Sequence, residues 1–88
     1  MVKIWGKIIK DNRIIKDEVA ICYEDVSYQQ ALKLCINEIC DKLDIPKPYW
    51  LPVNLKRYNQ FNKTFFNEDN FIEEIDFDRF AIEELEYK

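Results

Sequence analysis

The stretch VKIWGKIIKDNRIIKDEVAIC, residues 2–22, decides the fold, because it holds two apolar-rich runs on either side of one short polar break. The break is the dipeptide Asp11-Asn12, and both residue types tolerate the positive φ that a two-residue hairpin loop demands. We therefore predict a β-hairpin in which residues 2–10 pair with residues 13–22.

The simplest register of this hairpin pairs residues whose numbers sum to 23. On the expected core face it gives the pairs Val2–Ile21, Ile4–Val19, Gly6–Asp17 and Ile8–Ile15. On the other face it sets Lys7 directly opposite Lys16, which is mildly unfavourable. The two lysines would share that face with Lys3 and Trp5.

Residues 27–43, SYQQALKLCINEICDKL, predict an amphipathic helix that packs on the sheet. Ser27 followed by Gln30 fits a capping box at the first turn. Apolar residues recur at three- and four-residue steps along one broad stripe. The stripe consists of Tyr28, Leu32, Cys35, Ile36, Ile39, Cys40 and Leu43.

The second half of the chain is harder to interpret. Three prolines within residues 46–52 end the long helix and predict an extended connection. A shorter helix is expected over about residues 54–63, with Leu55, Tyr58, Phe61 and Phe65 near one face.

Residues 80–87 partly alternate and predict a third strand. A helix through Phe77, Phe80, Ala81 and Leu85 is the competing interpretation. We prefer the strand because a two-stranded hairpin is marginal by itself and needs a neighbour. The expected fold is a single two-layer α+β domain over residues 1–88: the hairpin and the C-terminal strand form a small antiparallel sheet, packed by one long and one short helix.

Several classes of function lack the residues that they need. The chain has no histidine and a single glycine, so the usual catalytic triads, most zinc sites and glycine-rich phosphate loops are missing. Cys35 and Cys40 lie about 140° apart around the expected helix, which is poor geometry for a shared metal, so packed thiols are expected. We predict no enzyme, no catalytic, metal-binding or cofactor-binding residue, and no small-molecule ligand.

The cellular compartment is predicted from two features. No apolar run approaches the roughly 18–20 residues of a membrane span or the shorter core of a signal peptide, so no membrane association is expected. The odd count of three cysteines, Cys22, Cys35 and Cys40, suits a reducing compartment. We therefore predict a cytoplasmic protein.

Charge is distributed unevenly along the chain. Residues 1–63 carry 11 basic and 8 acidic residues, a net +3, whereas residues 64–88 carry 2 basic and 9 acidic residues, a net −7. The spacing of the later carboxylates matches no calcium loop. A solvated acidic face is therefore expected for Glu73, Glu74, Asp76, Asp78, Glu83, Glu84 and Glu86.

Two surfaces are candidates for binding. Tyr49, Trp50 and Leu51 stand in a proline-stiffened segment, which is typical of a preorganised anchor for a protein partner or for a second copy of the chain. The structural alternative is that Trp50 and Leu51 close the core between two helices. A non-enzymatic interaction module is the leading hypothesis.

The second hypothesis is nucleic-acid binding by the basic hairpin. Lysines beside an aromatic ring supply charge for phosphate and a surface for base stacking. The residues concerned are Lys3, Trp5, Lys7 and Lys16. The neighbouring Glu18 and the net charge of −4 stand against it.

Three segments of the chain also carry a resemblance. They are WGKII (residues 5–9), PKPYWLP (46–52) and FIEEIDFDR (71–79). With them the chain resembles a family of small bacterial proteins from low-GC Gram-positive species, some of which accompany mobile elements. That family has no assigned activity, so the resemblance implies a cytoplasmic bacterial protein and transfers no functional residue.

Overall fold

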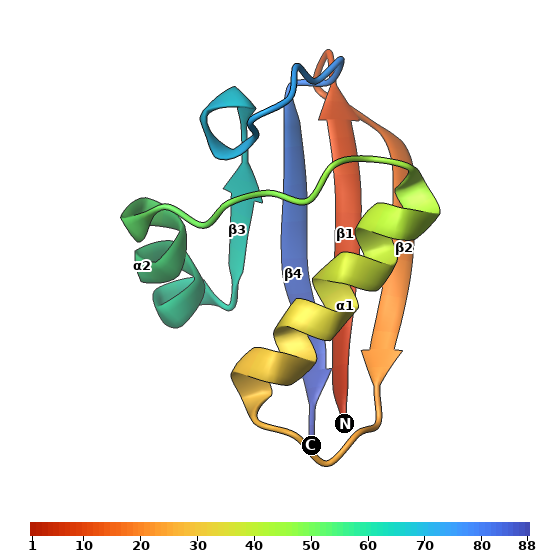
Figure 1. The fold of residues 1–88 in the computed structure, drawn as a ribbon, viewed down its shortest axis with the longest axis vertical. Coiled ribbons are helices and arrows are strands. Elements are labelled where there is room, and N and C mark those ends of the chain that lie inside the picture. The colour runs from red at the N-terminus through yellow and green to blue at the C-terminus, as the bar shows by residue number, and fades with distance from the viewer.

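Four antiparallel strands form one sheet in the order β2-β1-β4-β3; α1 crosses one face of it, and α2 lies beside the β3 edge (Figure 1). The computed structural model describes residues 1–88. Its elements in chain order are β1 (Val2–Lys10), β2 (Arg13–Cys22), α1 (Tyr28–Leu43), α2 (Pro52–Phe61), β3 (Lys63–Phe66), the 3-10 helix η1 (Glu68–Asn70) and β4 (Arg79–Tyr87). The predicted α+β class is confirmed, as is the C-terminal strand.

The hairpin forms as predicted, but the predicted register is correct only for the two pairs next to the loop, Lys10–Arg13 and Ile9–Ile14. Asp11 and Asn12 have φ angles of 53° and 64° and make the two-residue loop. The ladder then shifts between Ile8 and Ile9, so that Ile8 pairs with Lys16 and not with Ile15. A shift of one residue moves every following side chain of β2 to the opposite face of the sheet.

The shift has a physical reason on each face of the sheet. On the face toward α1 it places Ala20 and Cys22, which are both buried, where the predicted register had Val19 and Ile21. These smaller side chains let the helix lie close to the strand. On the far face, which we call the outer face, it replaces the predicted Lys7–Lys16 opposition with Lys7 opposite Asp17, an attractive pair.

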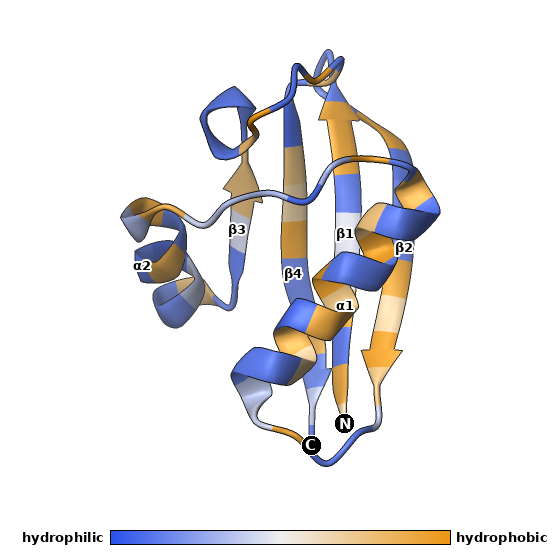
Figure 2. Cartoon of the chain, viewed as in Figure 1, coloured by the Kyte–Doolittle hydropathy of each residue, from blue (hydrophilic) through white to orange (hydrophobic).

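Helix α1 spans the predicted residues, but only one of the two bonds of the expected capping box forms. The Ser27 side chain accepts a hydrogen bond from the Gln30 backbone N–H at 3.2 Å. Asp44 ends the helix with a left-handed φ of 56°. All members of the predicted stripe are buried except Tyr28, which is half-buried, and hydrophilic residues alternate with them along the helix (Figure 2).

The core lies between α1 and the middle of the sheet. Ile4, Ile39, Phe66 and Phe80 have no exposed surface. Gly6 sits where the helix approaches most closely: a Cβ there would lie 2.6 Å from Cγ2 of Ile39 and 2.9 Å from Cε1 of Phe80. The one glycine of the chain therefore permits close packing of α1 on β1.

The region after α1 departs from prediction. Helix α2 spans Pro52–Phe61 and not residues 54–63, and Pro52 stands at its first turn, where its missing N–H costs nothing. Its buried residues are Asn54 and Tyr58, whereas Leu55 and Phe61, expected on the inner face, are more than half exposed. Strand β3, with Phe65 in it, was not predicted, so the sheet has four strands and not three.

Two buried asparagines hold this region together. The Asn54 side-chain oxygen accepts from the Leu51 N–H at 2.9 Å and from Nδ2 of Asn70 at 2.8 Å. Nδ2 of Asn54 donates to the Phe65 carbonyl at 2.8 Å, and Nδ2 of Asn70 donates to the Tyr49 carbonyl at 2.7 Å. These hydrogen bonds hold together α2, β3 and residues 44–51 between α1 and α2, which we call the linker. The apolar residues of α2 can therefore face outward.

Candidate functional site

A groove of about 750 Å³ opens between α1, the linker and α2, three segments that surround one area of the sheet in Figure 1. Its apolar wall is made by Tyr28, Leu32, Ile36, Trp50, Leu55 and Tyr58. Its polar lining comes from Gln29, Lys33, Asn37, Lys47 and Asn59, with Pro48 and Tyr49 at the linker. The groove is open to solvent and large enough for several side chains of a ligand.

Trp50 forms part of the groove and is also part of the core. It is half-buried, and its ring meets Tyr58 and Phe66 edge-on at centroid distances of 5.7 and 5.2 Å. Tyr49, by contrast, is 59% exposed. Leu51 is 37% exposed but does not line the groove. Of the three residues predicted to bind a partner, the structure brings Tyr49 and Trp50 together at one site.

A chain of hydrogen bonds ties the groove to the sheet. The Tyr28 hydroxyl donates to Oε1 of Glu84 at 2.6 Å and lies 2.7 Å from the Tyr58 hydroxyl, which then donates to it. The Tyr28 ring also stacks on Tyr87 at 4.7 Å. Burial raises the pKa of Tyr28 above its ordinary value, and the bond to Glu84 adds to this; burial also raises the pKa of Tyr58. Both phenols therefore stay neutral at pH 7 and act as hydrogen-bond donors.

The predicted basic surface has a different composition. Lys3, Trp5 and Lys7 alternate on the outer face of β1, but Lys16 pairs with Ile8 and belongs to the opposite face, a consequence of the register shift. Asp17 takes its place on the outer face. The four residues predicted for nucleic-acid binding therefore do not share one face.

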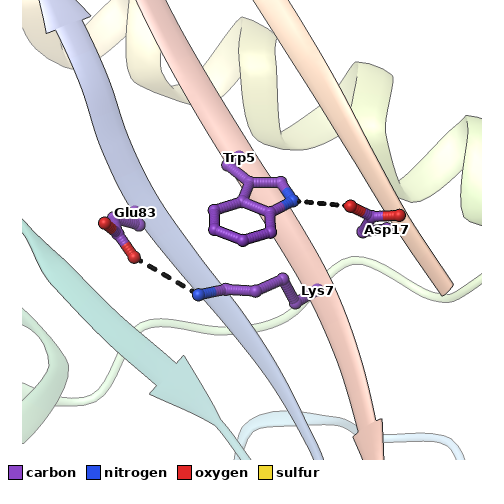
Figure 3. Close-up of polar contacts among 4 residues, drawn as sticks. All are labelled: Trp5, Lys7, Asp17 and Glu83. Carbon is purple, nitrogen blue, oxygen red and sulfur yellow. Dashed lines mark hydrogen bonds and ion pairs between the residues drawn. The ribbon is translucent and has the colours of Figure 1, made fainter. Parts of the chain in front are cut away.

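Trp5 and Lys7 are held by two carboxylates (Figure 3). The Trp5 indole N–H donates to Oδ2 of Asp17 at 2.9 Å, and Nζ of Lys7 bonds to Oε1 of Glu83 at 3.2 Å. The Lys7 ammonium also lies 4.1 Å from the centroid of the Trp5 ring, which is a cation–π distance.

The carboxylates predicted to form a solvated face are partly engaged. Glu83 pairs with Lys7, Glu84 accepts from Tyr28, and Asp78 accepts from the Asp11 N–H at 2.8 Å. No group of three cysteine, aspartate or glutamate side chains is close enough to hold a metal ion.

The three cysteines are free and buried, as predicted. Burial raises the pKa of Cys35 to about 11 and that of Cys40 to about 12. Because the thiolate is the nucleophile, these thiols are unreactive near pH 7.

The groove was missed in the sequence because its walls come from distant segments. Leu32 and Ile36 were correctly expected on the apolar stripe, but no spacing indicates that Leu55 faces them across an open space. One feature of the sequence could have indicated the orientation of α2. Asn54 and Tyr58 are four residues apart and lie on its buried side, which leaves Leu55 exposed.

Comparisons of the chain with protein-family models, with curated proteins and with solved structures found no match in any of the three. Neither helix has the length and apolar character required to cross a membrane. The resemblance to a family of low-GC Gram-positive bacteria stays a prediction.

Proposed function

We propose that the protein is a non-enzymatic interaction module whose groove receives apolar side chains of a protein partner that are flanked by acidic residues. The observation that carries the proposal is the open groove itself, whose lining includes the half-buried Trp50 and the exposed Tyr49 and Leu55. Exposed apolar residues gathered at one place are typical of a protein-binding surface.

The charge of the groove supports an acidic partner. Its lining contains Lys33 and Lys47 and no acidic residue. Lys33 has no ion pair, and Lys47 pairs at 3.0 Å only with Asp41, which lies outside the groove. Apolar anchors would supply the affinity, and carboxylates that meet the two lysines would set the orientation.

Hydrogen bonds between its walls also preorganise the groove for a partner. The hydrogen bonds of Tyr58 to Tyr28 and of Tyr28 to Glu84 join α1 and α2 to β4 across its base. A preformed site loses less conformational entropy on binding than a mobile one does.

A site-specific photocrosslinker tests the proposal. p-Benzoylphenylalanine at position 55, on the groove, is compared with the same group at position 53, because Val53 is an exposed apolar residue of α2 that does not line the groove. We expect a discrete protein adduct in the native cell from position 55 only, and its loss in the Lys33→Glu background. Equal adducts from both positions would contradict the proposal. Sedimentation velocity of the purified protein decides whether the partner is a second copy.

A further inference from the structure

The outer face of the sheet, opposite α1, has a depression between β1, β4 and β3 that α2 borders at the β3 edge. Lys7 on β1 pairs with Ala81 on β4, and Ala81 pairs with Phe65 on β3. These three residues form a cross-strand row. Because alanine carries only a methyl group, the surface is recessed at Ala81, between Lys7 and the Phe65 ring. The resulting hollow has a volume of about 380 Å³.

Positive charge surrounds this depression. Lys7, Arg57, Lys63 and Arg79 line it, against the single carboxylate of Glu83. Only Lys7 is paired with that carboxylate; the other three side chains make no ion pair and donate no hydrogen bond within the chain. The whole chain has a net charge of −4, so an excess of basic residues in the composition does not explain this positive cluster.

Aromatic rings stand among these cations. The guanidinium groups of Arg57 and Arg79 lie 4.5 and 5.6 Å from the centroid of the half-buried Phe65 ring. Trp5 lies in the next row of the same face, where it pairs with Glu83, which in turn pairs with Lys63. Trp5 is half-buried, with its indole fixed by Asp17. The face thus presents two rings with cations over them: Arg57 and Arg79 over Phe65, and Lys7 over Trp5.

We infer that this outer face binds single-stranded nucleic acid. Arg57, Lys63 and Arg79 turn to contact phosphates, which uncovers the Phe65 ring, and unpaired bases stack on Phe65 and Trp5. Each cation that meets a phosphate releases a counterion, and base stacking on aromatic rings tolerates any sequence. An acidic polypeptide would match the charges but would leave both rings without planar partners, so the nucleic acid fits more of the surface.

This site differs from the one predicted from the sequence. It keeps Trp5 and Lys7, omits Lys3 and Lys16, and moves the main phosphate contacts to β3, β4 and α2. It is also separate from the groove, which lies between the helices on the other side of the sheet.

Fluorescence anisotropy with a labelled 15-nucleotide dT strand, at 20 and 150 mM NaCl, tests the inference. We expect saturable binding at low salt that weakens steeply with salt. The double variant R57A/R79A should lower the affinity tenfold or more and reduce the salt slope by roughly 1.4, since each single-strand phosphate contact contributes about 0.7. Phe65→Leu, which keeps an apolar side chain but removes the ring, should lower the affinity about fivefold or more with the salt slope unchanged.

The matched control is K16A/K42A, which removes the same charge from β2 and α1 on the other side of the sheet, at residues that line neither the groove nor the depression. It should bind dT as the unmodified protein does. The inference is overturned if dT does not bind at 20 mM NaCl, if K16A/K42A weakens binding as much as R57A/R79A, or if a 15-residue polyglutamate displaces dT at equal concentration. Circular dichroism of each variant shows whether the fold is kept, and the Phe65→Leu result distinguishes stacking from charge attraction alone.

Discussion

The two faces of the sheet differ in what holds their side chains. Toward α1, Ile4, Ile39 and Phe80 pack with no exposed surface. On the outer face, Trp5 and Lys7 are only half-buried and are held by single contacts to carboxylates. Removing apolar surface from water is the dominant stabilising term in folding. The face toward α1 should therefore supply most of the stability, and the side chains of the outer face are available for binding.

The largest difference between the faces is expected for an isoleucine-to-alanine change. Ile39→Ala on α1 should lower the free energy of unfolding by about 3–4 kcal/mol, through lost burial and the cavity left behind. Ile21→Ala, at a 39% exposed residue of the outer face, should cost under about 1 kcal/mol. Urea denaturation followed by circular dichroism measures both. If Ile39→Ala does not fold, Ile39→Val gives the same ranking at about 1 kcal/mol. Equal costs for the two alanine variants would refute the division of roles.

A second test concerns the polar part of the buried side. Asn54→Ala removes an amide that bonds to Leu51, Phe65 and Asn70, and it leaves buried donors and acceptors without partners. We expect a cost of about 3 kcal/mol, because each unsatisfied buried group costs about 1–3 kcal/mol. Asn59→Ala, at an exposed position of the same helix, is the control and should be nearly neutral. An Asn54 variant as stable as the Asn59 variant would show that the network does not hold α2 and β3.

The third effect is smaller and depends on pH. The pKa values of Cys35 and Cys40, about 11 and 12, and that of Tyr28 lie above their ordinary values of 9.0 and 10.0. The folded state thus keeps protons that the unfolded state releases, so stability is fully present below about pH 9 and falls as the pH rises from there through 11 and 12. Denaturation curves at constant ionic strength between pH 7 and 11 measure this.

The Tyr28→Phe variant isolates the tyrosine contribution to this pH dependence. It should be less stable at pH 7, because Glu84 and Tyr58 lose their bonds to its hydroxyl. It should also lose less stability above pH 10, since it has no phenol to ionise. An identical alkaline decline in both proteins would contradict the role assigned to Tyr28.

Local sequence patterns predicted the elements whose causes are local. The Asp11-Asn12 loop, the Ser27 cap and the stripe of α1 depend on neighbouring residues, and the structure confirms all three. The short strand β3 could not be predicted, because four residues with two phenylalanines suit a helix end as well as a strand. It pairs with β4, and side-chain bonds from Asn54 of α2 to Thr64 and Phe65 hold it against α2.

The binding surfaces were only partly predictable because they depend on register and on distant packing. The shift between Ile8 and Ile9 decides that Asp17, and not Lys16, stands beside Trp5. The cations Arg57 and Arg79 are 22 positions apart in the sequence and meet at the Phe65 ring. Neither fact has a signal in residue spacing.

The smallest effect is expected at the hydrogen bond between Trp5 and Asp17 on the outer face. Asp17→Ala removes the acceptor of the Trp5 indole N–H, a bond of 2.9 Å at an exposed position. The free energy of unfolding should change by less than about 0.5 kcal/mol, because water replaces the lost acceptor. Trp5 fluorescence, read in the Trp50→Phe background, should nevertheless change in wavelength or quenching by iodide. A cost above about 1 kcal/mol would mean that the outer face also supports the fold. The aromatic rings of the outer face would then have a structural role, and the side chains proposed to bind nucleic acid would also be needed for stability.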